Sequence, residues 1–240
     1  MKNPKSLPNI IHFFGPDGAG KTTQVDILVD LLSRQGIPTR KIWVRSPHTL
    51  AFLLWRLFVK IGFYRLVINP FGPPGRLPGV DRSRLLRRFW SSVEFVSVLP
   101  LIARVNYLGR NNILIAERYL LDTVTTVAYF LNDFNFINSR TSRLLLRFIP
   151  KDTAFVFLDT DYATIYRRRA GLFNQQHFKM KRKDYGATPS CPVEPRSFID
   201  FQRKAYRTLA KSFDPLIIDT SKRSIEETST IIVQFLWAHQ

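Results

Sequence analysis

The sequence predicts an α/β fold in which helices cover both faces of a five-stranded parallel sheet. Five short apolar runs alternate along the chain with segments of helical periodicity. The first run is followed by a glycine-rich loop and then by a helical segment, the arrangement of a phosphate-binding unit. Because parallel strands need crossover connections, the alternation predicts three layers: helices, sheet and helices.

The five expected strands are mostly apolar, without the polar alternation of strands that face water on one side. This pattern is typical of a parallel sheet that is covered on both faces. The first strand ends at the glycine-rich loop, and each later one follows a turn signal of Gly, Pro, Asn or Asp. The expected strands span 9–14, 40–44, 112–117, 153–159 and 215–219.

Between these runs, apolar residues recur every three or four positions, as on the buried face of a helix. In the first helix this face includes Val25, Leu28 and Leu32, and Gly36 is a typical residue to end it. Pro100 could break the long third helix, because proline removes a helical hydrogen bond. The expected helices span 21–35, 50–68, 82–108, 119–131, 139–148, 161–170, 196–213 and 224–238.

The most apolar segment, 50–68, is long enough to cross a bilayer, but Arg56, Lys60 and Arg65 interrupt it. We therefore expect a buried or surface-docked amphipathic helix, although basic helices of this kind also bind anionic lipid. No long apolar run precedes the glycine-rich loop, so a signal peptide is not expected. The single cysteine, Cys191, excludes an intrachain disulfide and a multi-cysteine metal site, which favours the cytoplasm.

The length of 240 residues suits one α/β domain, and no linker divides it, so we expect a single domain from 1 to 240. The Pro- and Gly-rich stretch 69–79 is expected to be a loop within it. Lys and Arg number 36 against 18 Asp and Glu, which gives a net charge of +18. Such a charge attracts anions: nucleotides, nucleic acid or an acidic membrane face.

The stretch GPDGAGKT, from Gly15 to Thr22, matches the full G-x-x-x-x-G-K-[ST] pattern of a phosphate-binding loop. Glycines let the backbone turn its N–H groups inward, and the following helix adds a positive dipole end. Lys21 can reach the terminal phosphates, and the Thr22 hydroxyl is the expected Mg²⁺ ligand. The loop should hold the β- and γ-phosphates of a nucleoside triphosphate, with ATP expected. The expected ATP-binding residues are Gly15, Pro16, Asp17, Gly18, Ala19, Gly20, Lys21, Thr22 and Thr23.

A second substrate is expected at the carboxyl ends of the strands, where ligands bind in such sheets. Asp17 could bind an acceptor hydroxyl or tie down the loop backbone, and Arg45 could clamp an acceptor phosphate or form a surface ion pair. Glu117 could hold Mg²⁺ through water or position the acceptor, and Arg118 could grip a phosphate bidentately. Glu117 and Arg118 could instead simply pair with each other.

A basic stretch near 170–195 is expected to form a mobile lid. Arg167, Arg168 and Arg169 precede it, and it contains further lysines together with Gly171. A mobile cationic lid suits phosphoryl transfer, in which charge spreads over the transferred group and water must be excluded. The alternative is a solvated run of charges.

The motifs, taken in order, resemble the thymidylate kinase family of P-loop nucleoside monophosphate kinases over almost the whole chain. The resemblance rests on GPDGAGKTTQ, on ERY, on FLDTD followed by RRRAG, on FIDFQRKAYRTLAK and on LIIDTSKRSIEET. It implies the three-layer P-loop kinase fold with a lid. It also implies transfer of the γ-phosphate of ATP to deoxythymidine monophosphate (dTMP), with Mg²⁺ as cofactor.

By this resemblance Lys21 and Thr22 serve ATP and Mg²⁺, Asp17 contacts the acceptor sugar, Arg118 bridges the two phosphates and Arg45 reads the acceptor phosphate. Family members carry a catalytic arginine either in the loop, where this chain has Gly18, or in the lid. The lid is therefore expected to supply it, with Arg168 at the aligned position. The expected catalytic residues are Lys21, Arg118 and Arg168, the expected lid arginines are Arg167, Arg168 and Arg169, and the expected metal ligands are Thr22 and Glu117.

The sequence departs from the family pattern mainly around the acceptor. Glu117 replaces the usual Asp, and Asp122 stands where a serine is usual. In the helix expected to read the base, Phe89 or Trp90 could stack on it, but Ser92 stands near the position of the family's arginine. These departures bear on the base more than on the chemistry.

We therefore expect an ATP-dependent kinase that phosphorylates a nucleoside monophosphate, first of all dTMP. One alternative acceptor is a nucleoside or another small metabolite. An alternative of another class is a basic ATPase associated with nucleic acid or a membrane surface, although no RNA-binding signature is present. The resemblance also implies a homodimer formed by helices beside the sheet, for which the apolar faces of 50–68 and 85–108 are candidates; core packing would give the same pattern.

Overall fold

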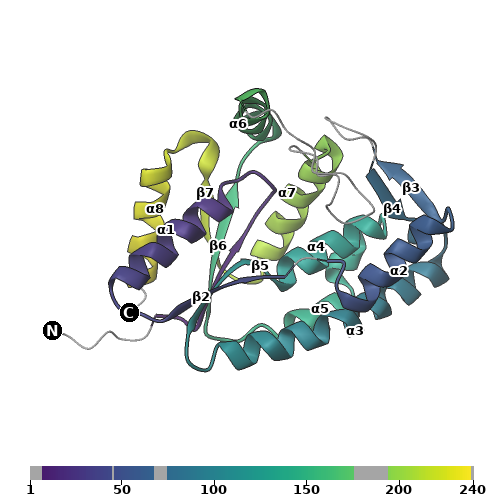
Figure 1. Ribbon diagram of the computed structural model, residues 1–240, viewed down its shortest axis with the longest axis horizontal. Coiled ribbons are helices and arrows are strands. Elements are labelled where there is room, and N and C mark those ends of the chain that lie inside the picture. Colours follow the sequence, from purple (N-terminus) through teal and green to yellow (C-terminus); the bar gives the residue numbers. More distant parts are fainter. Residues whose placement is uncertain (1–6, 45, 68–74, 176–193, 239–240) are drawn as a thin grey trace.

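A computed structural model describes residues 7–44, 46–67, 75–175 and 194–238 of the 240-residue chain (Figure 1). The main sheet has five parallel strands in the order β2-β5-β1-β6-β7. This confirms the predicted α/β fold and all five predicted strands to within two residues. The strands are β1 (Ile10–Phe14), β2 (Thr39–Trp43), β5 (Ile113–Arg118), β6 (Thr153–Asp159) and β7 (Leu216–Asp219).

Eight α-helices and three short 3₁₀ segments connect and cover the described strands. The long helix α3 runs through Pro100 without a break and begins at Ser83, whose hydroxyl accepts a hydrogen bond from the Leu86 amide. The α-helices are α1 (Lys21–Arg34), α2 (Thr49–Lys60), α3 (Arg84–Leu108), α4 (Leu120–Phe130), α5 (Arg140–Leu146), α6 (Tyr162–Gln175), α7 (Arg196–Ala210) and α8 (Ile225–Ala238). The 3₁₀ segments are η1 (Val80–Arg82), η2 (Phe134–Asn138) and η3 (Thr220–Lys222).

The prediction of one helix over 50–68 is wrong in its second half. Helix α2 ends at Lys60, and Gly62 takes a positive φ of 79°, which stops the helix as glycine commonly does. Strand β3 (Tyr64–Val67) follows and pairs antiparallel with β4 (Gly75–Pro78), so the stretch expected as a loop over 69–79 also ends in a strand. Among the described residues, no helix combines the length and apolarity needed to cross a membrane.

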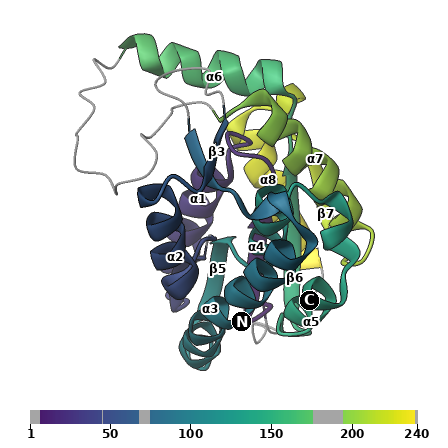
Figure 2. The same ribbon diagram turned by 90° about the vertical axis from the view of Figure 1, so that its right-hand side faces the viewer.

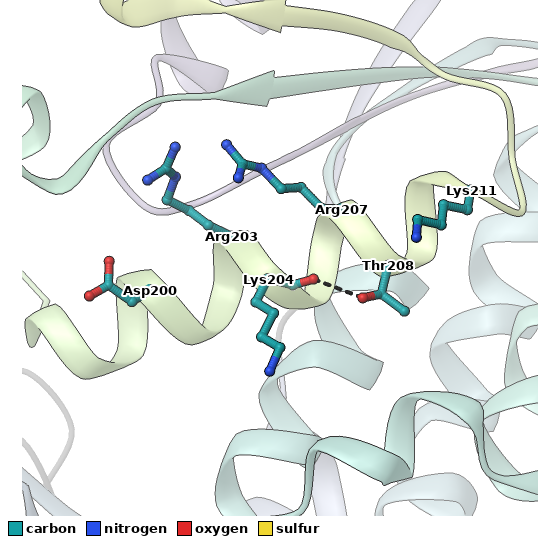
Figure 3. A pocket seen from close by; sticks show the side chains of 6 residues that line it. All are labelled: Asp200, Arg203, Lys204, Arg207, Thr208 and Lys211. Atoms are coloured by element: carbon teal, nitrogen blue, oxygen red, sulfur yellow. Dashed lines mark hydrogen bonds between the residues drawn. The ribbon is translucent and has the colours of Figure 1, made fainter.

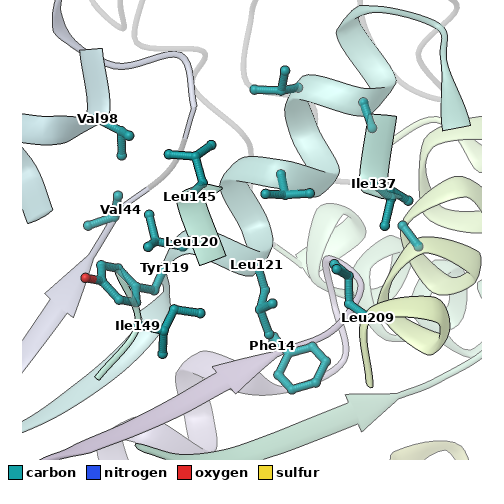
Figure 4. Close-up of a cluster of buried hydrophobic side chains, with 14 of the residues drawn as sticks. Phe14, Val44, Val98, Tyr119, Leu120, Leu121, Ile137, Leu145, Ile149 and Leu209 are labelled. Carbon is teal, nitrogen blue, oxygen red and sulfur yellow. The ribbon is translucent and has the colours of Figure 1, made fainter. Parts of the chain in front are cut away.

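Two hydrophobic cores flank the sheet. Helices α1 and α8 cover one face, and α3, α4, α5 and α7 pack on the other (Figures 1 and 2). On the larger side, side chains from the sheet meet those of α4 and α7, including Phe14, Leu121 and Leu209 (Figure 4). Burial of both faces explains why the central strands β1 and β6 are mostly apolar.

Strand β1 lies at the centre of the sheet, between β5 and β6. The next strand in sequence, β2, pairs with the outer side of β5, whereas β6 and β7 lie on the other side of β1. The chain therefore leaves the carboxyl end of β1 at a point where the connections diverge to the two sides. Open α/β sheets bind ligands in the crevice at such a point.

Candidate functional site

The glycine-rich loop, residues 15–22, occupies this point between β1 and α1. Gly15, Gly18 and Gly20 have φ values of 141°, 96° and 91°, a region that side chains rarely adopt. A β-carbon on Gly15 would lie 2.0 Å from the carbonyl oxygen of Leu158 in β6, so the loop passes closer to the sheet than any other residue would allow. The loop thus needs glycine for its conformation as well as for its motif.

Lys21 is buried at the start of α1 and folds back over the loop. Its Nζ donates hydrogen bonds to the carbonyl oxygens of Gly15 at 2.6 Å and Pro16 at 2.9 Å, and lies 3.6 Å from Asp17 Oδ1. Burial, and next the nearby charge of Arg118, lower the pKa of the Lys21 ammonium to about 8. An anion reached by this ammonium would compensate the charge that the interior disfavours.

Arg118, the last residue of β5, joins the loop to α4. Its guanidinium binds the Asp17 carboxylate and lies 3.6 Å from Oδ1 of Asp122. Burial opposes its charge, but Asp17 and Asp122 outweigh this and raise the pKa of Arg118 above its ordinary value. The structure therefore brings together Asp17 and Arg118, two residues that the sequence assigns to the acceptor side.

Helix α7 supplies two partners that sequence reasoning missed. The Gln202 side chain accepts a hydrogen bond from the Asp17 amide at 3.0 Å, and the Tyr206 hydroxyl donates one to Asp122 at 2.9 Å. Both stand on the apolar face of α7 with Phe198 and are fully buried. Polar residues within an apolar helical stripe are a sequence signal for buried hydrogen bonds.

The expected metal ligands also lie together. The Thr22 hydroxyl donates to Glu117, whose other oxygen is 3.2 Å from Nζ of Lys41. These are hard oxygen donors, as Mg²⁺ prefers, and Mg²⁺ in phosphoryl-transfer sites takes one or two protein ligands and fills its shell with phosphates and water. No group of three or more His, Cys, Asp or Glu side chains suited to a metal occurs in the part of the chain that the structure describes. The residues present fit a metal held jointly with a nucleotide.

The three consecutive arginines of α6 point to different places. Arg168 donates to the Thr220 carbonyl oxygen at 2.5 Å, at the start of η3. A β-carbon added to Gly18 would lie 3.5 Å from Nε of Arg169, so Arg169 is the one beside the glycine-rich loop, whereas Arg167 is exposed. The lid beyond Gln175 lies outside the described residues up to residue 193.

The two aromatic residues expected to read the acceptor base differ in their exposure to solvent. Trp90 is fully buried and packs against Phe58 with ring centroids 5.9 Å apart, whereas Phe89 is exposed. Trp90 is therefore a core residue, and only Phe89 of this pair is accessible to a base. Arg45 lies outside the described residues.

Glu94 is a buried carboxyl group one turn beyond Trp90. It is 1% exposed, and the Ser46 hydroxyl donates to its Oε1 at 2.7 Å, which ties α3 to the segment after β2. Its Oε2 has no hydrogen-bond partner among the described residues. Burial raises the pKa of Glu94 to about 8, and the hydrogen bond from Ser46 only partly opposes this.

The raised pKa of Glu94 predicts a pH-dependent stability. Between about pH 4.5 and pH 8 the folded chain keeps a proton on this carboxyl group that the unfolded chain has released, so the free energy of unfolding falls as the pH rises. We expect Glu94→Gln to remove this dependence and to be the more stable protein at pH 8, by on the order of 3 kcal/mol. Thermal melts of both proteins at pH 5 and pH 8 check this, with pH 5 as the control at which they should match. If Glu94→Gln and the unchanged protein had the same melting temperature at pH 8 as well as at pH 5, the raised pKa of Glu94 would be contradicted.

A pocket of about 290 Å³ lies along α7, apart from the glycine-rich loop, and is lined mainly by basic residues. Arg203 and Arg207 point toward the sheet and Lys204 points the other way (Figure 3). Both arginines bind the Asp159 carboxylate at the end of β6, at 2.9 Å and 2.5 Å. One carboxylate thus engages both arginines, so we interpret this pocket as the outer side of a structural ion-pair cluster.

Comparison with known proteins does not extend these observations. No protein-family model matches the sequence, and the curated proteins give no significant match. The function therefore has to be argued from the geometry above and from the motifs.

Proposed function

We propose that this protein is an ATP-dependent kinase of the thymidylate kinase family that phosphorylates a nucleoside monophosphate, with dTMP as the expected acceptor. One observation carries the proposal: a buried lysine within a glycine-rich loop lies beside the Asp17–Arg118 pair at the carboxyl ends of β1 and β5. A nucleotide-binding loop alone needs no such pair. A buried, permanently charged guanidinium next to the loop suits a second phosphate.

The protein groups divide the work of phosphoryl transfer by position. Such transfer needs alignment and charge compensation rather than a covalent intermediate. We propose that Lys21 leaves its backbone acceptors for the terminal phosphates of ATP, and that Arg118 holds the acceptor phosphate in line. Asp17 would then accept a hydrogen bond from the acceptor sugar. Thr22 and Glu117 would hold Mg²⁺, which supplies further charge compensation when bound.

We further propose that a lid arginine takes the place of the cation that Gly18 lacks. The position of Arg169 beside Gly18 favours Arg169 for this role, because the side chain of Arg168 is directed to Thr220 in η3 and not to the glycine-rich loop. With φ at 96° and Ile165 only 2.7 Å from an added β-carbon, Gly18 itself has no room for a side chain. The loop therefore supports a lid-supplied cation in this chain.

Release of ADP tests the proposal. In a coupled assay with ATP and Mg²⁺, a panel of nucleosides and nucleoside monophosphates would be compared, and we expect stimulation by dTMP and little by deoxythymidine. Stimulation by deoxythymidine alone would favour the nucleoside kinase alternative, which the altered base-reading helix also allows. Failure of every acceptor would overturn the kinase proposal, and stimulation by polynucleotide instead would favour the ATPase alternative.

A further inference from the structure

Helix α2 presents a row of large apolar side chains to solvent. Leu50, Leu53 and Leu57 of α2, and Ile61 directly after its last residue, are 46%, 63%, 49% and 65% exposed. Because a helix turns about 100° per residue, their spacing of three and four places them on one face. The opposite face buries Ala51 and Trp55 in the core. The outer row is therefore not used to hold the described fold together.

Basic side chains lie beside this row, and the part of the chain that the structure describes supplies no acidic partner to them. Arg56 and Lys60 are exposed and, by the same helical geometry, border the leucines on one side. Between residues 49 and 110 the chain has ten Lys and Arg but two acidic residues. One of these, Glu94, is buried, and the other, Asp81, lies 3.5 Å from Arg65. The surface formed by this part of the chain is cationic as well as apolar.

The neighbouring helix α3 also exposes apolar and basic side chains. Helix α3 packs beside α2 at the end of the molecule remote from α1 and α8 (Figures 1 and 2). It exposes Leu85 near its start, together with Arg84 and Arg88. Single exposed apolar residues are ordinary, but a row of three leucines on one helix, continued by Ile61 and by Leu85 on the next helix, marks an interaction surface.

We infer that the outer face of α2 docks the protein on an anionic lipid bilayer, with the leucine row at the level of the acyl chains and Arg56 and Lys60 at the lipid phosphates. A helix with one apolar face and Lys or Arg at its border binds in this way. The positive charge of this face favours a bilayer over a second copy of the chain. A second copy would place two cationic surfaces against each other, whereas an anionic bilayer complements the charge. This inference concerns a face other than the candidate site and does not rest on the proposed kinase activity.

Vesicle co-sedimentation of the full-length protein tests the inference. The probes are vesicles of phosphatidylcholine with 30% phosphatidylserine, and vesicles of phosphatidylcholine alone. We expect binding to the anionic vesicles that weakens at high salt, and roughly tenfold weaker binding to the neutral ones. The variant Leu53→Glu/Leu57→Glu should bind the anionic vesicles at least about tenfold more weakly than the unchanged protein.

The matched control is Ile225→Glu, which removes an exposed apolar side chain at the start of α8, on the other side of the sheet. It should bind as the unchanged protein does, and thermal melts should show that all variants fold. Absence of binding to anionic vesicles would overturn the inference, as would equal binding by the Leu53→Glu/Leu57→Glu variant. So would a dimer in analytical ultracentrifugation that this variant converts to monomer without any vesicle binding, because the face would then pair two copies.

Discussion

Lys21→Met should lower the rate of phosphoryl transfer by at least about 10³-fold while leaving the protein folded. Methionine has a similar length but no charge, so the variant would lose the cation that faces the terminal phosphates. Stability should be unchanged or higher, because burial already disfavours the ammonium and lowers its pKa to about 8. The measurement is ADP release at saturating acceptor, together with a thermal melt.

Lys151→Met is the matched control for this variant. Lys151 is exposed and precedes β6 at its amino end, the edge of the sheet opposite the glycine-rich loop. It should retain full activity. If Lys21→Met kept near-normal turnover, Lys21 would have no part in the chemistry and the proposed mechanism would fail.

Arg118→Met should destabilise the protein by about 3–5 kcal/mol, because it removes the guanidinium that binds the buried Asp17 and lies beside the buried Asp122. Breaking one side of a buried ion pair costs more than replacing the whole pair, since the remaining charge stays desolvated. Urea unfolding of the unchanged protein and the variant measures the difference.

The double variant Asp17→Asn/Arg118→Met serves as the control for stability, since it removes a charge on each side. We expect it to recover part of the loss, and both variants to lack phosphoryl transfer. A single variant as stable as the unchanged protein, within about 0.5 kcal/mol, would show that the pair does not hold the loop to β5.

Much of the fold was predictable because burial leaves a clear mark on the sequence. The central strands of a sheet covered on both faces are mostly apolar, and Gly36 and the glycine-rich loop mark where the chain turns. The prediction of a single helix over 50–68 failed because α2 and β3 are both apolar, and composition alone does not separate two adjacent elements. The positive φ of Gly62 divides them.

The candidate site was predictable only where one stretch of sequence carries the chemistry. The loop from Gly15 to Thr22 is local, whereas the partners of Asp17 and Asp122 on α7 are 185 and 84 residues away in the chain. The choice between Phe89 and Trp90 stayed open for a related reason: an aromatic residue on an amphipathic helix suits either a ligand or the core. Packing against Phe58 decides for the core.

The most direct test of the proposed function identifies the molecule that receives the γ-phosphate of ATP. The protein would be incubated with ATP labelled at the γ-phosphate, Mg²⁺ and dTMP, and the products separated by chromatography. The proposal predicts that the label appears in deoxythymidine diphosphate. Label found only in inorganic phosphate, at the same rate with and without dTMP, would contradict it.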